Sequence, residues 1–102
     1  MADFNVTVVK RTTNSIELVW SNYIHLHSGG VRFYAALAKR SNSSSEPNGK
    51  IVPGNTTTSE VMDLEAYTEY NVSVVVVNVN GTQFKTADVL VWTDEGGKYL
   101  TL

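Results

Sequence analysis

Short runs of alternating apolar and polar residues extend along almost the whole chain. Ile16, Leu18 and Trp20 alternate with the residues between them, and Val6 and Val8 alternate in the same way. β-Branched and aromatic residues, which favour strands, dominate these runs. No segment repeats apolar residues at helical spacing over ten or more positions. The pattern therefore predicts an all-β chain.

Polar turn residues divide this pattern into seven predicted strands. They cover residues 5–10, 15–21, 31–39, 51–52, 59–64, 69–79 and 85–92. The serine- and asparagine-rich stretch 41–49 is expected to be a loop. Asn80-Gly81 is expected to reverse the chain, because both residues tolerate the positive φ of a tight hairpin turn. Seven short strands with polar turns are typical of an antiparallel sandwich.

The segment 64–81 carries the most specific pattern. Leu64 ends one predicted strand and Tyr70 begins the next, and Tyr70, Val72, Val74 and Val76 share one face of it. A tyrosine at this place can bury its ring and return its hydroxyl to the backbone of the preceding corner. That arrangement is the tyrosine corner of Greek-key sandwiches.

These residues resemble the signature of the fibronectin type III family, Leu-x-Pro-x-Thr-x-Tyr-x-Val-x-Val-x-Ala-x-Asn-x-x-Gly, with a core tryptophan earlier in the chain. The matching positions are Trp20, Tyr34, Leu64, Thr68, Tyr70, Val72, Val74, Asn78 and Gly81. Ala66 stands where proline is usual, and Val76 where alanine is usual. The resemblance implies a seven-stranded, antiparallel Greek-key sandwich of the immunoglobulin-like class over residues 4–95. Residues 1–3 and 96–102 are then expected to be flanking or linker sequence.

Composition narrows the kinds of site that the chain can carry. Its 102 residues include no cysteine, which excludes disulfides, thiolate zinc sites and a cysteine nucleophile. The formal charge of −2 does not favour a nucleic-acid or anionic-membrane partner. The basic pairs Lys10-Arg11 and Lys39-Arg40 are too few on an acidic domain to favour heparin. No apolar run is long enough to span a membrane.

Five N-glycosylation triplets, Asn-x-Ser/Thr, are the clearest functional signal. Their asparagines are Asn5, Asn42, Asn55, Asn71 and Asn80. With nine asparagines in the chain, and about a fifth of its residues Ser or Thr, chance would place about two such triplets. A β-domain rich in asparagine and threonine can also collect triplets that are never modified. The excess, and the expected turn or outward positions, favour a secreted or ectodomain origin.

The later strands are apolar on both faces. If Tyr34 points inward, Phe33 points outward, and Val75 faces out on its strand by the same alternation. Alignment of Thr93 with the closing threonine of the family turns Trp92 outward. The predicted apolar patch, a contact face for a partner, consists of Phe33, Leu37, Val75, Val77, Leu90 and Trp92. Two alternatives are an alternation shifted by one residue and a loop that covers this face.

The segment 21–30 is apolar for a loop. We expect Ile24 or Leu26 to close the end of the sandwich, although loops at this pole can also carry recognition. His25 and His27 lie two residues apart, but a metal site needs a third ligand and none is evident nearby. We therefore expect solvated histidines and no bound metal.

Patterns that indicate chemistry are missing. The serines have no His–Asp pair close in sequence, and no glycine-rich phosphate loop occurs. Neither an Arg-Gly-Asp triplet nor a Trp-Ser-x-Trp-Ser box is found. We therefore expect a chain without catalytic activity and without a cofactor.

The resemblance and the triplets together predict a non-catalytic interaction and spacer domain from the extracellular part of a larger adhesion or receptor glycoprotein. Expected partners are neighbouring domains in tandem, an extracellular ligand or a second copy. Nucleic acid and direct membrane insertion are not expected. One alternative is an accessory domain of a larger enzyme, such as a receptor phosphatase, a receptor kinase or a bacterial polysaccharide hydrolase. Another is an intracellular scaffold or muscle domain, in which the triplets are accidental.

Overall fold

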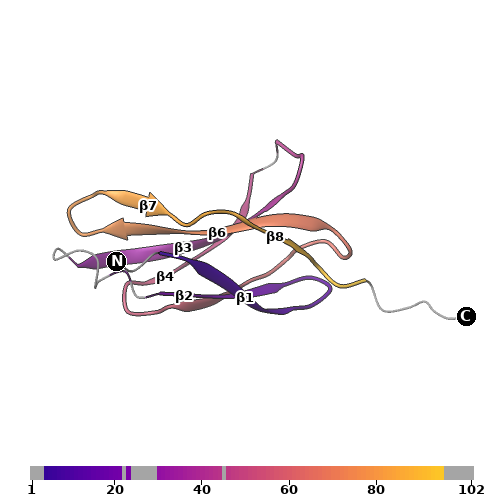
Figure 1. Cartoon of the computed structure of the whole chain (residues 1–102), viewed down its shortest axis with the longest axis horizontal. Coiled ribbons are helices and arrows are strands. Elements are labelled where there is room, and N and C mark those ends of the chain that lie inside the picture. The colour runs from indigo at the N-terminus through magenta and orange to yellow at the C-terminus, as the bar shows by residue number, and fades with distance from the viewer. Residues whose placement is uncertain (1–3, 22, 24–29, 45, 96–102) are drawn as a thin grey trace, which may run out of the picture.

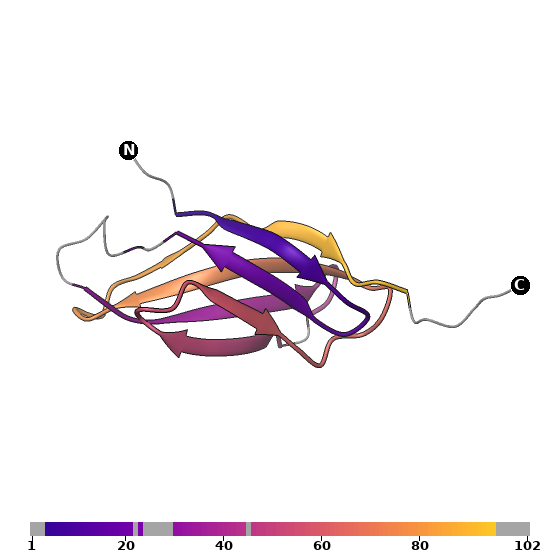
Figure 2. The same ribbon diagram turned by 90° about the horizontal axis from the view of Figure 1, so that it is seen from below.

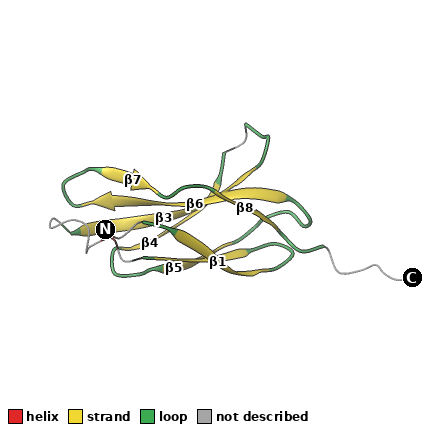
Figure 3. Cartoon of the chain, viewed as in Figure 1, coloured by secondary structure: helices red, strands yellow, loops and turns green. Residues whose placement is uncertain are grey.

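A computed structural model shows a sandwich of two antiparallel sheets, seen from two sides in Figures 1 and 2. It describes residues 4–21, 23, 30–44 and 46–95. Figure 3 shows strands joined by loops through this described part of the chain. The all-β, immunoglobulin-like fold class predicted from the sequence is confirmed.

In the described part of the chain, eight strands build the two layers. They are β1 Val6–Arg11, β2 Ile16–Trp20, β3 Val31–Arg40, β4 Asn48–Pro53, β5 Thr58–Val61, β6 Glu69–Asn78, β7 Gln83–Lys85 and β8 Val89–Trp92. The smaller sheet has the order β1-β2-β5, and the larger has the order β4-β3-β6, with β7 and β8 both paired to β6. The chain crosses between the sheets from β2 to β3, from β4 to β5 and from β5 to β6, as in a Greek-key sandwich.

The core lies between the inner faces of the sheets. Ile16 and Leu18 on β2 are completely buried, and the ring of Trp20 packs against that of Tyr34, with centroids 5.3 Å apart. Alternate residues of β3 and β6 close the core from the other side. The buried inward set on these two strands is Tyr34, Ala36, Ala38, Tyr70, Val72, Val74 and Val76. The inward faces predicted for these strands are therefore confirmed, and burial of apolar core side chains such as these is the main favourable contribution to folding.

The last predicted strand is two strands, so the predicted count of seven is corrected to eight. Thr86 lies buried at the break between β7 and β8. Its backbone N–H donates to the carbonyl of Val74 at 2.9 Å, and its Oγ1 accepts the N–H of Val74 at 3.0 Å. The side chain thus replaces a backbone acceptor, and the chain resumes strand pairing only at Val89. Alternation of residue types does not reveal such a break.

The tyrosine corner predicted at Tyr70 is present. The Tyr70 Oη accepts a hydrogen bond from the backbone N–H of Glu65 at 2.9 Å, and the Tyr70 ring is 4% exposed. Thr93 reinforces this corner, because its Oγ1 donates to the Glu65 carbonyl at 2.6 Å and accepts the N–H of Thr68 at 3.0 Å. The buried Leu64 packs in the core beside it. Signature residues from distant parts of the sequence therefore hold one end of the sandwich.

The turn between β6 and β7 forms where Asn80-Gly81 predicts it. Gly81 has a φ of 91°, a value that glycine adopts without strain. The Asn78 N–H donates to the Thr82 carbonyl at 2.9 Å, and its side-chain Nδ2 donates to the Thr82 Oγ1 at 3.0 Å. Asn78 is 1% exposed, so this signature residue positions the turn from inside.

Candidate interaction surface

Apolar side chains cover one half of the outer face of the five-stranded sheet, the half nearest the β6–β7 turn. We define this apolar cluster as Phe33, Ala35, Ile51, Val75 and Val77. Its members occupy two adjacent cross-strand rows on β4, β3 and β6. Ile51 is 68% exposed, and the others are half-buried. Because exposed apolar surface of this kind favours contact with a partner, the cluster is a candidate interaction surface.

Ile51 is an outer-face residue that the sequence analysis did not identify. Residues 51–52 predict only a short strand with no assigned face. Val52 is buried and pairs with Tyr34, so its neighbour Ile51 points outward. Alternation along the strand could have indicated the outward position of Ile51. The sequence alone did not show that β4 pairs with β3, and without this pairing the face of each residue could not be assigned.

Leu90 and Trp92 do not join the apolar cluster, and the prediction of one continuous patch is corrected. Both side chains point outward as predicted, with exposed fractions of 61% and 43%. However, Leu90 pairs with Asn71, four residues along β6 from Val75. At about 3.3 Å per residue this is a separation of about 13 Å. Trp92 instead packs against the exposed ring of Tyr67, with centroids 5.1 Å apart.

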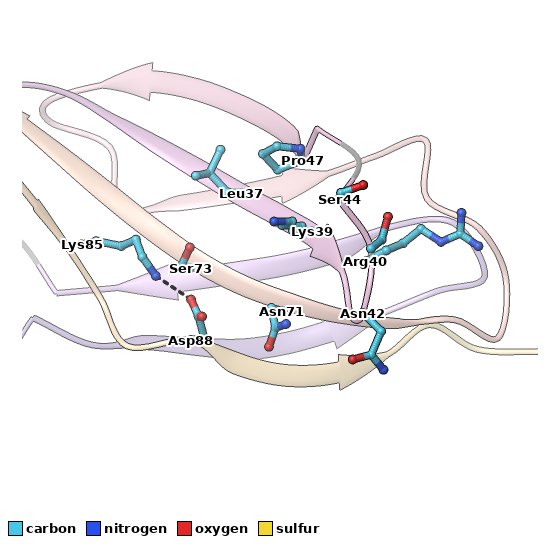
Figure 4. A pocket seen from close by; sticks show the side chains of 11 residues that line it. Leu37, Lys39, Arg40, Asn42, Ser44, Pro47, Asn71, Ser73, Lys85 and Asp88 are labelled. Atoms are coloured by element: carbon cyan, nitrogen blue, oxygen red, sulfur yellow. Dashed lines mark hydrogen bonds and ion pairs between the residues drawn. The ribbon is translucent and has the colours of Figure 1, made fainter.

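A groove of about 570 Å³ lies on the outer face, between the apolar cluster and the region of Leu90 and Trp92. Figure 4 shows its base on β3 and β6, with Lys39, Asn71 and Ser73. The β3–β4 loop, with Ser44 and Pro47, forms one wall. This loop stands away from the sheet in Figure 1, and on the predicted face its residues line the groove.

The opposite wall of the groove carries an ion pair between Lys85 and Asp88. The side chain of Leu37 also lines the groove. The Lys85 Nζ lies 2.6 Å from the Asp88 Oδ1, at the break between β7 and β8. Lys39 is exposed and forms no ion pair with any residue that the structure describes. The groove is thus polar at its edges, with charges of both signs.

The five predicted glycosylation asparagines fall into two groups. Asn5, Asn42, Asn55 and Asn80 have exposed side chains in turns or at a strand start. Asn71 is half-buried on β6. Asn42 and Asn71 both line the groove.

At two of the exposed asparagines, the hydrogen bonds of the side chain do not involve the nitrogen atom to which a sugar would be attached. The Asn80 Oδ1 accepts the backbone N–H of Thr82 at 3.0 Å and its hydroxyl at 2.7 Å. The Asn55 Oδ1 accepts the hydroxyl of Thr56 at 3.3 Å. In both cases the amide oxygen is engaged, and a sugar would attach to the amide nitrogen.

Aromatic residues close the sandwich at the pole where β3 begins. The Tyr23 N–H donates to the Tyr34 Oη at 2.9 Å, and the Tyr23 ring stacks on Phe84 with centroids 5.7 Å apart. Burial raises the pKa of Tyr23 above its ordinary value of 10.0. The residues predicted to close this end or to remain solvated (Ile24, Leu26, His25 and His27) lie outside the described part of the chain.

The basic pairs are partly neutralised by neighbouring carboxylates. Arg11 lies 3.4 Å from a carboxylate oxygen of Asp94, and Arg40 lies 3.0 Å from one of Glu65. These pairs reduce the charge available to a polyanion. Among the residues that the structure describes, no group of three or more His, Cys, Asp and Glu side chains could hold a metal ion.

Comparison with known proteins identifies a family and two relatives. The family model described as fibronectin type III domain matches residues 3–91. The MAM and fibronectin type III domain-containing protein 1 of Acropora millepora is 35% identical over 92 residues, which are 90% of this chain and 22% of the relative. Cell adhesion molecule Dscam1 of Drosophila melanogaster is 29% identical over 90% of this chain and 5% of its own length. The chain therefore spans a minor part of each relative.

Solved structures agree on the fold. The fn3 domain of human contactin 1 has a TM-score of 0.77 at 16% identity, with 97% of this chain and 80% of that chain covered. Identity at this level supports the fold alone. In the described residues, no helix has the length and apolar character needed to cross a membrane.

Proposed function

Because the chain belongs to the fibronectin type III family, we propose that it is a non-catalytic interaction and spacer module in the extracellular part of a multidomain adhesion or receptor glycoprotein. Members of this family are generally protein-interaction modules. One of the two relatives is named a cell adhesion molecule. The module would work by presenting a surface to another protein, since domains of this fold carry function in grafted sites.

The observation that carries the extracellular location is the placement of the glycosylation triplets. Four of the five asparagines have exposed side chains, where the fold leaves room for an attached glycan. A glycan at a core position would prevent folding, so glycosylation of all five triplets requires that none of their asparagines lies in the core. None of the five asparagines is among the buried residues.

The apolar cluster supports the interaction role. Phe33, Val75 and Val77 are not needed to fill the core, because they lie on the side of the sheet away from it. Surface of this kind is costly to expose to water unless a partner covers it. Candidate partners are a neighbouring domain, an extracellular ligand or a second copy of this chain.

Secretion from cultured animal cells tests the proposed location. We expect peptide mapping of the secreted protein to find N-glycans on the exposed Asn42, Asn55 and Asn80. Asn14 is exposed but lies in no triplet, so its peptide serves as the unmodified control. Thr57→Ala should remove the glycan from Asn55 alone. Secreted protein without a glycan at any of the five triplets would contradict an extracellular glycoprotein.

A further inference from the structure

We infer that the groove on the outer face of the five-stranded sheet is the bed of an N-linked glycan carried by Asn71. The inference rests on the proposed passage through the secretory pathway. It concerns where the sugar lies in the folded domain, and what it covers there.

Attachment to Asn71 follows the ordinary chemistry of this modification. The amide nitrogen Nδ2 displaces the diphosphate of a lipid-linked oligosaccharide. A bond forms from Nδ2 to C1 of the first sugar, the C1–O bond to the lipid diphosphate breaks, and Nδ2 gives up one proton. Because transfer acts on the extended, unfolded chain, the burial of Ser73 in the finished sheet does not prevent it.

The strand register decides where the first sugars then lie. Asn71 is in the middle of a sheet and pairs with Lys39 of β3 on one side and Leu90 of β8 on the other. Directly opposed side chains in antiparallel strands have Cβ atoms about 5 Å apart. The first sugar is therefore flanked by a cation and an apolar side chain. By contrast, Asn42 has an exposed side chain on the turn after β3, at the rim of the groove.

This arrangement gives a reason for the exposed apolar side chain of Leu90. Its side chain is 61% exposed, and its partner Asn71 lies about 13 Å along β6 from Val75, the nearer of the two apolar-cluster residues on that strand. The C–H face of a sugar ring on Asn71 would cover it. Sugar hydroxyls would meet Lys39 and the Lys85–Asp88 pair, which Figure 4 shows on either side of Asn71 and Ser73.

The size of the groove fits such an occupant. Its volume of about 570 Å³ falls in the range of about 300–1,000 Å³ that is usual for sites holding small organic groups. A glycan anchored inside the groove also excludes a peptide from it. The outer face then has a sugar-covered half around Asn71 and a bare half at the apolar cluster.

The rate of glycan release from the folded protein tests this arrangement. Secreted protein is treated without denaturant with an amidase that converts each released site to aspartate, in ¹⁸O-water, and the label is measured site by site. We expect release at Asn71 to be at least about tenfold slower than at Asn55, because the sugar must first leave its bed by a local opening. After denaturation both sites should be released at similar rates.

A matched pair of variants identifies the cause of protection. Leu90→Ser removes the proposed apolar contact and should accelerate release at Asn71 without changing Asn55. Ile51→Ser alters a similarly exposed residue of the same sheet that pairs with Ala35 and not with Asn71, and should change neither rate. Both side chains point away from the core, so both variants should fold.

Each result decides between the inference and the proposed function. Slow release at Asn71 that Leu90→Ser accelerates supports the glycan bed. Equal native rates at the two sites overturn it, as does slow release that Leu90→Ser leaves unchanged. Glycans on the exposed asparagines with none on Asn71 overturn the bed and leave the extracellular proposal standing. No glycan on any triplet overturns both.

Discussion

At the residue scale, a few hydroxyl groups hold the ends of the sandwich. Tyr70 and Thr93 lie 23 positions apart in the sequence, and both bond to the backbone of Glu65. Each hydroxyl group forms a hydrogen bond with a backbone group of Glu65 that has no partner in a neighbouring strand. Hydrogen bonds of this kind contribute little net energy when made, but a buried group left without a partner is costly.

We expect Tyr70→Phe to lower the free energy of unfolding by about 1–3 kcal/mol, because the Glu65 N–H loses its acceptor while the ring remains. Urea denaturation of the purified domain measures the change. Tyr67→Phe is the control: its side chain is 63% exposed, so the change should stay within about 0.5 kcal/mol. Equal effects of the two substitutions would contradict a stabilising tyrosine corner.

Tyr23 gives the domain a predicted sensitivity to alkali. Burial raises its pKa above 10.0, so the folded state favours the neutral phenol. Its contribution to stability is complete below pH 10 and is lost as the pH rises through the raised pKa. We expect Tyr23→Phe to lose less stability than wild type between pH 9 and 11, in denaturation measured at a series of pH values. Parallel curves for the two proteins would show that Tyr23 does not contribute.

The signature residues were predictable because each has a local reason for its place. Tyr70 follows a strand end, and Gly81 sits where a turn needs a positive φ. The role of Thr86 was not predictable, because it depends on a hydrogen bond to Val74, 12 positions away. Residue type gives no sign of such a partner.

At the scale of elements, the register of β6 organises the outer face. One half of this strand pairs with β7 and the other with β8. The alternation of residues predicted which side chains point outward. It did not predict which of them are neighbours, because that depends on where the chain rejoins β6 after the break at Thr86.

Thr86→Val tests how that break is held. The substitution keeps the volume but removes the acceptor of the buried Val74 N–H, so we expect a loss of about 1–3 kcal/mol in urea denaturation. Thr86→Ser keeps the hydroxyl and should recover most of this loss. If serine destabilises as much as valine, the hydroxyl does not hold the break.

At the scale of the whole molecule, the two outer halves of one sheet have different chemistry. The apolar cluster lies on the half nearest the β6–β7 turn, and the groove with Asn42 and Asn71 lies on the other. The fold class and outward faces were predictable from the sequence. The groove was not, because it is formed by segments far apart in the chain: β3, the loop after it, β6 and the β7–β8 break.

The most direct test of an interaction module is adhesion of beads coated with the secreted domain, to one another and to a panel of cells. We expect wild-type beads to adhere and Phe33→Ser/Val77→Ser beads to lose at least about nine-tenths of that adhesion, since few residues dominate an interface. Leu90→Ser/Trp92→Ser beads, altered on the same face outside the apolar cluster, should adhere like wild type. Circular dichroism should show all three proteins folded. Adhesion that survives in Phe33→Ser/Val77→Ser beads, or that is missing from wild-type beads, would contradict the account.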